Sequence, residues 1–188
     1  SEVYGVEASF SKALFEGLTL SGGVAYTHGR YLDYPGAPAN IFDYVFDGMD
    51  TAGNPNPGPA GGLTDGQADN RAVDVSGNHM IRSPDWSGNI ALDYVADLGN
   101  VGFFKLNGNA AYSSKVFFDA ANNNVQDAFT TVNLRAGWTD PGENLSISVY
   151  TNNLLDNDVI SQVLPNGFGT GVSWQPPRSY GVTLMYEY

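Results

Sequence analysis

Cysteine is absent from this chain of 188 residues, so it forms neither a disulfide framework nor a cysteine-based metal site. No apolar run approaches the roughly 20 residues that a membrane-spanning helix needs. Basic residues are also few, because 8 Lys and Arg stand against 20 Asp and Glu, for a formal net charge of −12. Nucleic acid requires a basic face for its phosphates, so the composition excludes a nucleic-acid partner.

Charged residues make up only 15% of the chain, whereas roughly a quarter is usual in soluble domains. Glycine (23 residues), tyrosine (11) and phenylalanine (10) are abundant and suit strands, turns and aromatic girdles. No G-x-S-x-G or dinucleotide-binding motif is present, and the glycines of 167–171 are typical of a loop. We therefore expect no enzyme, no resident cofactor and no metal centre.

Apolar and polar residues alternate in seven segments, which predicts an all-β chain of seven strands without amphipathic helices. The expected strands cover about 2–14, 18–32, 82–95, 101–118, a segment around 132–138, a segment from about 144, and 180–188. Tight turns alternate with the long connections 33–79, 119–127 and 152–176. Outer-membrane barrels alternate short periplasmic turns with long extracellular loops, so the pattern predicts an antiparallel transmembrane β-barrel segment.

The last nine residues carry apolar or aromatic side chains at every second position and end on an aromatic residue. The residues of this closing-strand signal are Tyr180, Gly181, Val182, Leu184, Tyr186 and Tyr188. Successive side chains of a strand point to opposite faces, so the alternating apolar residues share one face. A final strand of this kind is typical of an outer-membrane barrel, which must leave no open edge in lipid.

Five ionisable residues inside the cores of the expected strands all fall on the polar face. They are Glu7, Asp93, Lys105, Arg135 and Glu187. A basic side chain on the lipid face near the membrane midplane costs about 2–4 kcal/mol, so this placement favours a lumen on the polar side. We expect these five residues to form the luminal wall, where they pair with a plug domain or with one another.

Seven strands are an odd number, whereas single-chain bacterial barrels have an even one. About eight strands are also the minimum that closes around a filled interior. The first strand would moreover start on the extracellular side, although barrels are delivered from the periplasm. We therefore expect residues 1–188 to be the C-terminal portion of a larger barrel.

Several short stretches resemble TonB-dependent outer-membrane receptors. Tyr150–Asp156, with Asn-Asn-Leu-Leu-Asp, is similar to an element near the end of these proteins, and 177–188 is similar to their closing strand. Tyr4-Gly-Val-Glu7 and Phe118-Asp119 with Asn122 resemble other recurrent stretches. The resemblance extends along essentially the whole chain, and its specificity comes from the order and spacing of these motifs.

The resemblance implies a 22-stranded barrel in the Gram-negative outer membrane, of which this chain is roughly the last seven strands. It also implies uptake of a scarce ligand, such as iron–siderophore, cobalamin or oligosaccharide. The implied partners are outer-membrane lipid, an N-terminal plug domain, TonB acting through that plug, and the barrel assembly machinery. The plug itself is absent from residues 1–188, and the ligand is not readable from the sequence.

The long connection 33–79 contains aromatic residues in a setting rich in Gly, Pro and Asp. The candidate ligand-contact residues are Tyr34, Phe42, Tyr44 and Phe46. Loops on rigid scaffolds frequently carry function, so these rings either stack on a ligand or pack over the barrel mouth. The aspartates of this connection lack the ligand pattern of a calcium loop, which favours a solvated surface. His28 and His79 are interpreted as residues of the loop rim.

Two alternatives stay open at this point. One is a stand-alone small outer-membrane barrel that serves as an adhesin or a pore. The other is a soluble β-sandwich that binds carbohydrate through exposed aromatic residues. The sandwich differs from the larger barrel and from the small barrel in one structural property, because it would bury the apolar faces of its strands in a compact interior.

Overall fold

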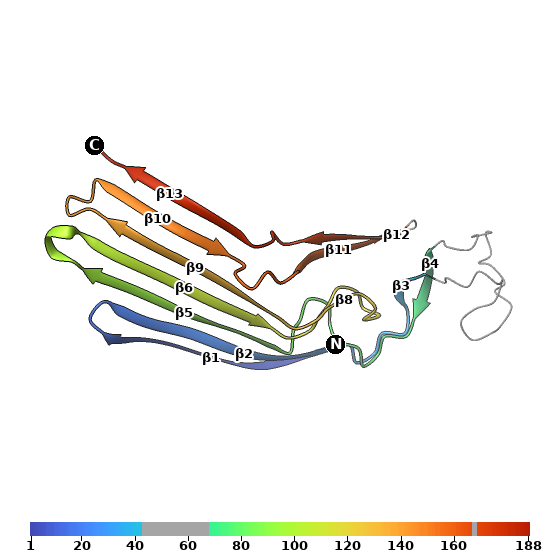
Figure 1. Cartoon of the computed structure of the whole chain (residues 1–188). Helices are drawn as coiled ribbons and strands as arrows, with labels where there is room; N and C mark the ends of the chain where they lie inside the picture. The colour runs from blue at the N-terminus through green and yellow to red at the C-terminus, as the bar shows by residue number, and fades with distance from the viewer. Residues whose placement is uncertain (43–67, 167–168) are drawn as a thin grey trace.

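One antiparallel sheet of seven long strands dominates the computed structural model, which describes residues 1–42, 68–166 and 169–188 (Figure 1). Neighbours in the sheet follow one another along the chain once the short hairpins between them are set aside. In sheet order the strands are β1 (Glu2–Phe15), β2 (Leu18–Arg30), β5 (Trp86–Asp97), β6 (Phe103–Ser113), β9 (Phe129–Thr139), β10 (Leu145–Asn152) and β13 (Ser179–Tyr186). The seven expected strands and their antiparallel order are confirmed.

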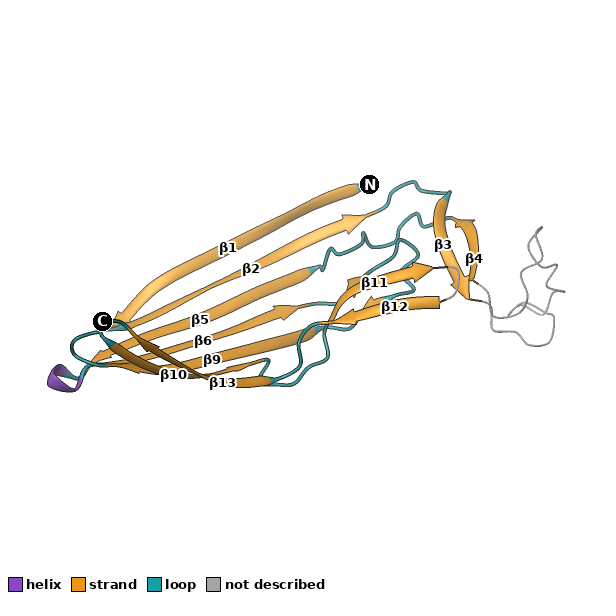
Figure 2. Ribbon diagram, turned by 90° about the horizontal axis from the view of Figure 1, so that it is seen from above, coloured by secondary structure: helices purple, strands orange, loops and turns teal. Residues whose placement is uncertain are grey.

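Tight turns lie at one end of the sheet and long connections at the other (Figure 1). Each long connection contains a short antiparallel strand pair that alternation did not predict. The pairs are β3 (Ala37–Phe42) with β4 (Ala68–Val73), β7 (Val116–Phe117) with β8 (Val125–Gln126), and β11 (Ile160–Asn166) with β12 (Gly169–Trp174). The hairpins β3–β4 and β11–β12 extend beyond the long-connection end of the sheet (Figure 2).

Two strands differ most from their expected ranges. The third long strand starts at Trp86 and not near 82, because Arg82 has a φ of 53° and Pro84 has no N–H for a ladder. The fourth covers Phe103–Ser113, shorter than 101–118. The 3₁₀ turn η1 (Gly99–Val101) and Gly102, with a φ of 104°, precede it. Among the described residues, no helix is long and apolar enough to span a membrane.

The strand register gives the sheet one apolar and one polar face. Opposed pairs such as Leu20 with Leu92 and Leu106 with Ala136 keep apolar side chains on the same side across the strands. Neither face is covered by another layer of described residues. The buried hydrophobic residues are instead Ala37, Val75, Val159 and Val163, all of which lie outside the seven-stranded sheet.

Close contacts between an aromatic ring and a glycine fix the register at two places. Tyr150 is paired with Gly181 across β10 and β13, and a Cβ atom at Gly181 would overlap the Tyr150 ring. Phe10 covers Gly22 across β1 and β2, with ring carbons 3.0 and 3.2 Å from the position of a Cβ atom. Gly181 of the closing-strand signal is therefore required by the packing of the Tyr150 ring on the neighbouring strand β10.

Gly181→Val should destabilise the sheet by about 1–3 kcal/mol, because the new side chain displaces the Tyr150 ring. Thermal unfolding of the full-length protein in detergent, followed by heat-modifiable migration on a gel, measures the effect. Adding Tyr150→Ala to Gly181→Val should recover part of the loss, since the two residues are in direct contact.

Gly171→Val in β12 is the matched control. A Cβ atom at Gly171 would lie 3.7 Å from the Leu164 carbonyl oxygen, an ordinary contact distance. This variant should unfold as the wild type does. Equal effects of the two valine substitutions would contradict a specific contact between Tyr150 and Gly181.

Candidate functional site

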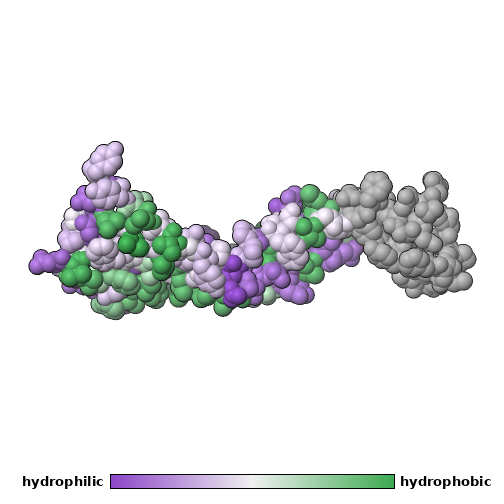
Figure 3. All heavy atoms as spheres, turned by 45° about the horizontal axis from the view of Figure 1, so that its top comes forward, coloured by the Kyte–Doolittle hydropathy of each residue, from purple (hydrophilic) through white to green (hydrophobic). Residues whose placement is uncertain are grey.

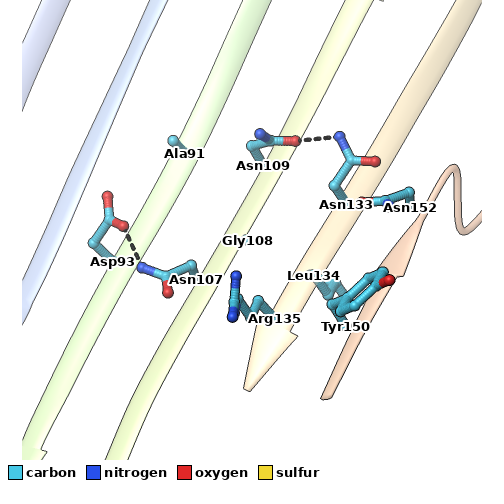
Figure 4. A pocket seen from close by; sticks show the side chains of 10 residues that line it. All are labelled: Ala91, Asp93, Asn107, Gly108, Asn109, Asn133, Leu134, Arg135, Tyr150 and Asn152. Carbon is cyan, nitrogen blue, oxygen red and sulfur yellow. Dashed lines mark hydrogen bonds between the residues drawn. The ribbon is translucent and has the colours of Figure 1, made fainter. Parts of the chain in front are cut away.

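A hydrogen-bonded row of polar side chains crosses the middle of the sheet (Figure 4). The Asn107 amide donates to the Asp93 carboxylate over 2.6 Å, and the Asn133 amide donates to Asn109 over 2.9 Å. The Arg135 guanidinium donates to the Ser148 hydroxyl from Nε at 3.1 Å and Nη2 at 2.8 Å. These bonds join four neighbouring strands, and all of the bonded residues except Ser148 line an open hollow on the polar face.

The register shows how the five expected wall residues lie. Asp93 opposes Asn107, which opposes Arg135, so these side chains share a face. Glu7 opposes Ala25, and Lys105 opposes Gly137. The alternation along these strands places both side chains on the same face as Asp93. Glu187 follows the end of β13, where its backbone N–H donates to the Asn144 carbonyl over 2.9 Å. Its position continues the same alternation.

Lys12 is an ionisable residue of β1 on the opposite, apolar face, where it opposes Leu20. It lies near the tight turn at Glu16 and Gly17. A lysine near the membrane boundary can extend its amine to the headgroups while its stem stays on apolar surface. The position of Lys12 near the tight turn is therefore compatible with its place on the apolar face.

Large hydrophobic side chains of the apolar face are exposed even on interior strands. The relative exposure is 49% for Val24, 48% for Ile90 and 40% for Leu134. Green hydrophobic residues gather over the sheet in Figure 3, and purple hydrophilic residues lie between the sheet and the grey atoms. No compact interior covers this face in the described part of the chain, so the β-sandwich alternative is wrong.

Aromatic residues pair near both ends of this apolar face. Tyr26 and Trp86 have ring centroids 4.9 Å apart near the long connections. Phe15 and Tyr94 lie 6.1 Å apart at the tight turns, where the indole N–H of Trp138 also donates to a turn carbonyl. Amphipathic rings at two levels are the arrangement found at the two interfaces of a membrane barrel.

At the long-connection end, a cluster that we call the His79 clasp joins two connections. It consists of Arg30, His79, Asp85, Phe117 and Asn122. Asn122, with a φ of 60°, accepts the His79 N–H over 2.9 Å and donates to the His79 carbonyl over 3.0 Å. Arg30 lies 3.2 Å from Asp85, and the His79 and Phe117 rings are 4.9 Å apart. The connections from β2 to β5 and from β6 to β9 are thereby fixed to each other.

A second cluster, the Asn153 clasp, holds the connection between β10 and β13. It consists of Asn133, Asn153, Asp156, Asn157 and Arg178. Asn153 is buried with a φ of 49°, its N–H donates to Asn133 Oδ1 over 2.9 Å, and its amide exchanges two hydrogen bonds with Asn157. Asp156 accepts the Arg178 N–H and lies 3.1 Å from its guanidinium.

Both clasps fall on stretches that carry the family resemblance. Asp119 and Asn122 belong to the first stretch, where the Asp119 carboxylate accepts the backbone N–H groups of Asn123 and Asn124. Asn153, Asp156 and Arg178 belong to the other two. Sequence reasoning missed the long-range hydrogen bonds of Asn153 and Asp156. The available signal was the asparagine-rich character of these loops, because asparagine tolerates the left-handed backbone.

Of the expected ligand-contact residues, Tyr34 is described with its side chain. It is partly exposed, its ring lies 5.5 Å from that of Tyr31 in an edge-on contact, and its N–H donates to the Ser76 hydroxyl. Phe42 ends β3, with its backbone opposite Ala68. Tyr44 and Phe46 lie outside the described residues.

The acidic character of this connection was not assigned to a metal site, and the described residues contain no cluster of three metal-ligating side chains. Hydrogen bonds from the Ser76 side chain and backbone lower the pKa of Asp74. His28 stacks on Tyr4 at a ring distance of 4.6 Å, and its Nε2 lies 4.0 Å from a Glu2 carboxylate oxygen. The two histidines thus have separate aromatic partners at the rim.

An antiparallel wall with one exposed apolar face and one hydrogen-bonded polar face defines the protein as part of a membrane β-barrel. The family described as TonB dependent receptor-like, beta-barrel matches residues 1–154. The chain therefore belongs to the TonB-dependent receptor β-barrel family. This is a family of receptors of the Gram-negative outer membrane and not of enzymes.

Solved structures share the fold along nearly the whole chain. The ferric yersiniabactin uptake receptor FyuA from Yersinia pestis has a TM-score of 0.65 at 17% identity over 99% of this chain. The siderophore receptor PiuA from Acinetobacter baumannii has a TM-score of 0.63 at 16% identity over 99%. The ferric preacinetobactin receptor BauA from the same species has 0.61 at 17% over 98%.

These three structures are much longer than the chain, which spans 23%, 22% and 22% of their respective lengths. The structural similarity shows a common fold, and the low sequence identity leaves the ligand of this chain open. No match was found among curated proteins.

Neighbouring positions of β5 test the assignment of the two faces. Ile90→Arg places a guanidinium on the apolar face and should reduce the folded outer-membrane yield strongly, in line with a cost of about 2–4 kcal/mol. Asn89→Arg, on the polar face of the same strand, should be tolerated. The amount of heat-modifiable protein in isolated outer membranes compares the two variants. Equal yields of Ile90→Arg and Asn89→Arg would contradict the assignment of the apolar and polar faces.

Asn153→Ala should lower the stability of the outer rim by about 1–3 kcal/mol, because it removes two hydrogen bonds of a buried side chain. Asn153→Gly separates the loss of hydrogen bonds from the effect of backbone strain, since glycine adopts the positive φ freely but makes no side-chain bonds. We expect the glycine variant to be only slightly more stable than the alanine variant in thermal unfolding. Full recovery with glycine would show that backbone strain alone sets the effect.

Proposed function

We propose that this chain is one section of the wall of an outer-membrane receptor that takes up a scarce ligand, foremost an iron–siderophore complex. The observation that supports it most is the match in fold to siderophore receptors over 98–99% of the chain. The free edges of β1 and β13 support a larger barrel, because each has one neighbour in the described sheet and open edges are not stable in lipid.

The polar face is proposed to line the lumen and to contact a plug domain, through which TonB would supply energy. The row from Asp93 to Arg135 supports this role, because its charges are already hydrogen-bonded to Asn107 and Ser148. Glu7, Lys105 and Glu187 would add fixed charges along the same wall. A polar wall of this kind offers hydrogen bonds to a plug or to a passing hydrophilic ligand.

The closing strand is proposed to carry the assembly function. Tyr180, Val182, Leu184 and Tyr186 share one exposed face of β13, and Tyr188 extends beyond it. We propose that the barrel assembly machinery recognises this strand and that outer-membrane lipid then covers its apolar face. Tyr34 and the neighbouring segment with Phe42, Tyr44 and Phe46 are proposed as the ligand-contact loop on the outer side.

Uptake of radiolabelled ligands by cells that lack the gene tests the transport function. Representative iron-loaded hydroxamate, catecholate and phenolate siderophores, cobalamin and malto-oligosaccharides serve as probes. Loss of uptake of one siderophore, restored by the full-length gene but not in cells without TonB, is the expected result. Equal uptake of every probe with and without the gene would contradict a role in their transport. If only the uptake of cobalamin or of oligosaccharide depends on the gene, that compound identifies the alternative ligand class.

A further inference from the structure

An apolar hollow of about 550 Å³ lies on the apolar face of the sheet, over β9, β10 and β13. Leu134 borders it on one side and Tyr180 on the other, with Thr151 between them. We propose that one acyl chain of an outer-leaflet lipid occupies this hollow and is held there more tightly than the lipids along the rest of the face. The proposal rests on the proposed contact of this face with lipid, and it does not depend on the transported ligand.

The strand register explains why the hollow is apolar. Thr151 of β10 opposes Leu134 of β9 and Tyr180 of β13, so the three side chains share the apolar face. The next row toward the tight turns consists of Ala136, Val149 and Val182. Both sides of the hollow therefore belong to the described sheet, although β13 is its last strand.

The hollow exists because Leu134 leans away from Thr151. A Cβ atom at Gly108, which opposes Leu134 across β6 and β9, would lie 3.0 Å from the Leu134 Cδ2 atom. The leucine side chain thus extends over Gly108, and the short Thr151 side chain does not fill the space left over β10. On the other side, the Arg178 guanidinium lies 6.0 Å from the centroid of the Tyr180 ring and packs on it at the start of β13.

The position of the hollow selects the kind of occupant. Thr151 is the last residue but one of β10 and Tyr180 is the second residue of β13, so the hollow starts near the long connections. In an outer-membrane barrel the long connections are extracellular, which places the hollow in the outer leaflet. Just beyond it, the Arg178 guanidinium is paired with Asp156 at 3.1 Å and marks the polar boundary.

Packing provides the attraction, because lipid tails and aliphatic side chains are equally apolar. A chain on a flat part of the face contacts protein on one side only. A chain in the hollow contacts the strand beneath it and the side chains of Leu134 and Tyr180 beside it. Dispersion contacts are individually small and add up with the number of neighbouring atoms, so this chain is bound more tightly than its neighbours.

Three variants separate the shape of the hollow from other effects. Thr151→Phe fills its centre. Thr151→Val is the matched control, because it keeps the size of the side chain and loses no hydrogen bond: Thr151 Oγ1 has no partner in the described part of the chain. Ala110→Phe adds the same ring to the same face outside the hollow, where Ala110 opposes Ile90 and Val132.

Retention of lipid measures the effect. Each full-length protein is reconstituted into phosphatidylethanolamine vesicles and extracted with detergent, and native mass spectrometry measures the fraction that keeps a lipid. This fraction should correspond to about fivefold weaker binding in Thr151→Phe, or about 1 kcal/mol, and should equal that of the wild type in both controls. Equal retention by Thr151→Phe and the wild type, or a matching loss in either control, would overturn the proposal.

Phosphatidylethanolamine with a photoreactive group in its acyl chain locates the bound chain in the unmodified protein. After detergent extraction, the crosslinks should fall on β9, β10 and β13 around Leu134, Thr151 and Tyr180. Crosslinks on β5 at the same yield would show that the hollow holds no chain of its own. Such a result would leave the membrane contact of the face standing, because Ile90→Arg and Asn89→Arg test that contact separately.

Discussion

The fold depends on the contact between one face of the sheet and hydrocarbon. Ordinary β proteins cover such a face with a second sheet or with helices, and here no described layer does so. In water, an uncovered face with residues such as Val24 and Ile90 would drive aggregation. In a bilayer the same face is solvated by lipid, while the hydrogen bonds between strands satisfy the backbone. The membrane thus takes the place of a hydrophobic core.

This constraint also explains why the charged residues lie where they do. A slip of one residue in strand pairing would turn Asp93 and Arg135 toward lipid and the aliphatic side chains toward the lumen. The cost of charge in hydrocarbon makes such slips unfavourable. Lys12 is compatible with the rule because it lies at the end of its strand. The contacts of Tyr150 with Gly181 and of Phe10 with Gly22 fix the same register by steric fit.

The sequence allowed the seven strands and the two faces to be predicted, because a period of two is a local property of each segment. The hairpins within the long connections were not predicted. In β3, for example, Pro38 and Asn40 interrupt the alternation that marks a strand. The clasps were missed for a different reason: Asn122 bonds a residue 43 positions away, and Asn153 bonds one 20 positions away. Such distances in sequence become contacts only through the order of the strands.

The asparagines of the two clasps show how polar side chains add order to a barrel rim that buries few hydrophobic residues among those described. A side-chain amide imitates a peptide group, so Asn122 pairs with His79 much as one strand pairs with another. The rim thereby gains fixed geometry while its connections stay polar.

The ring of Tyr150 over Gly181 has a consequence for how this wall changes in evolution. The two positions lie on different strands, 31 residues apart in the printed sequence, yet a side chain at 181 cannot be accommodated while the Tyr150 ring stays in place. A larger residue at 181 requires a smaller one at 150. Among homologous barrels, the two positions should therefore covary as a pair, and this coupling would report the pairing of β10 with β13 without any structure.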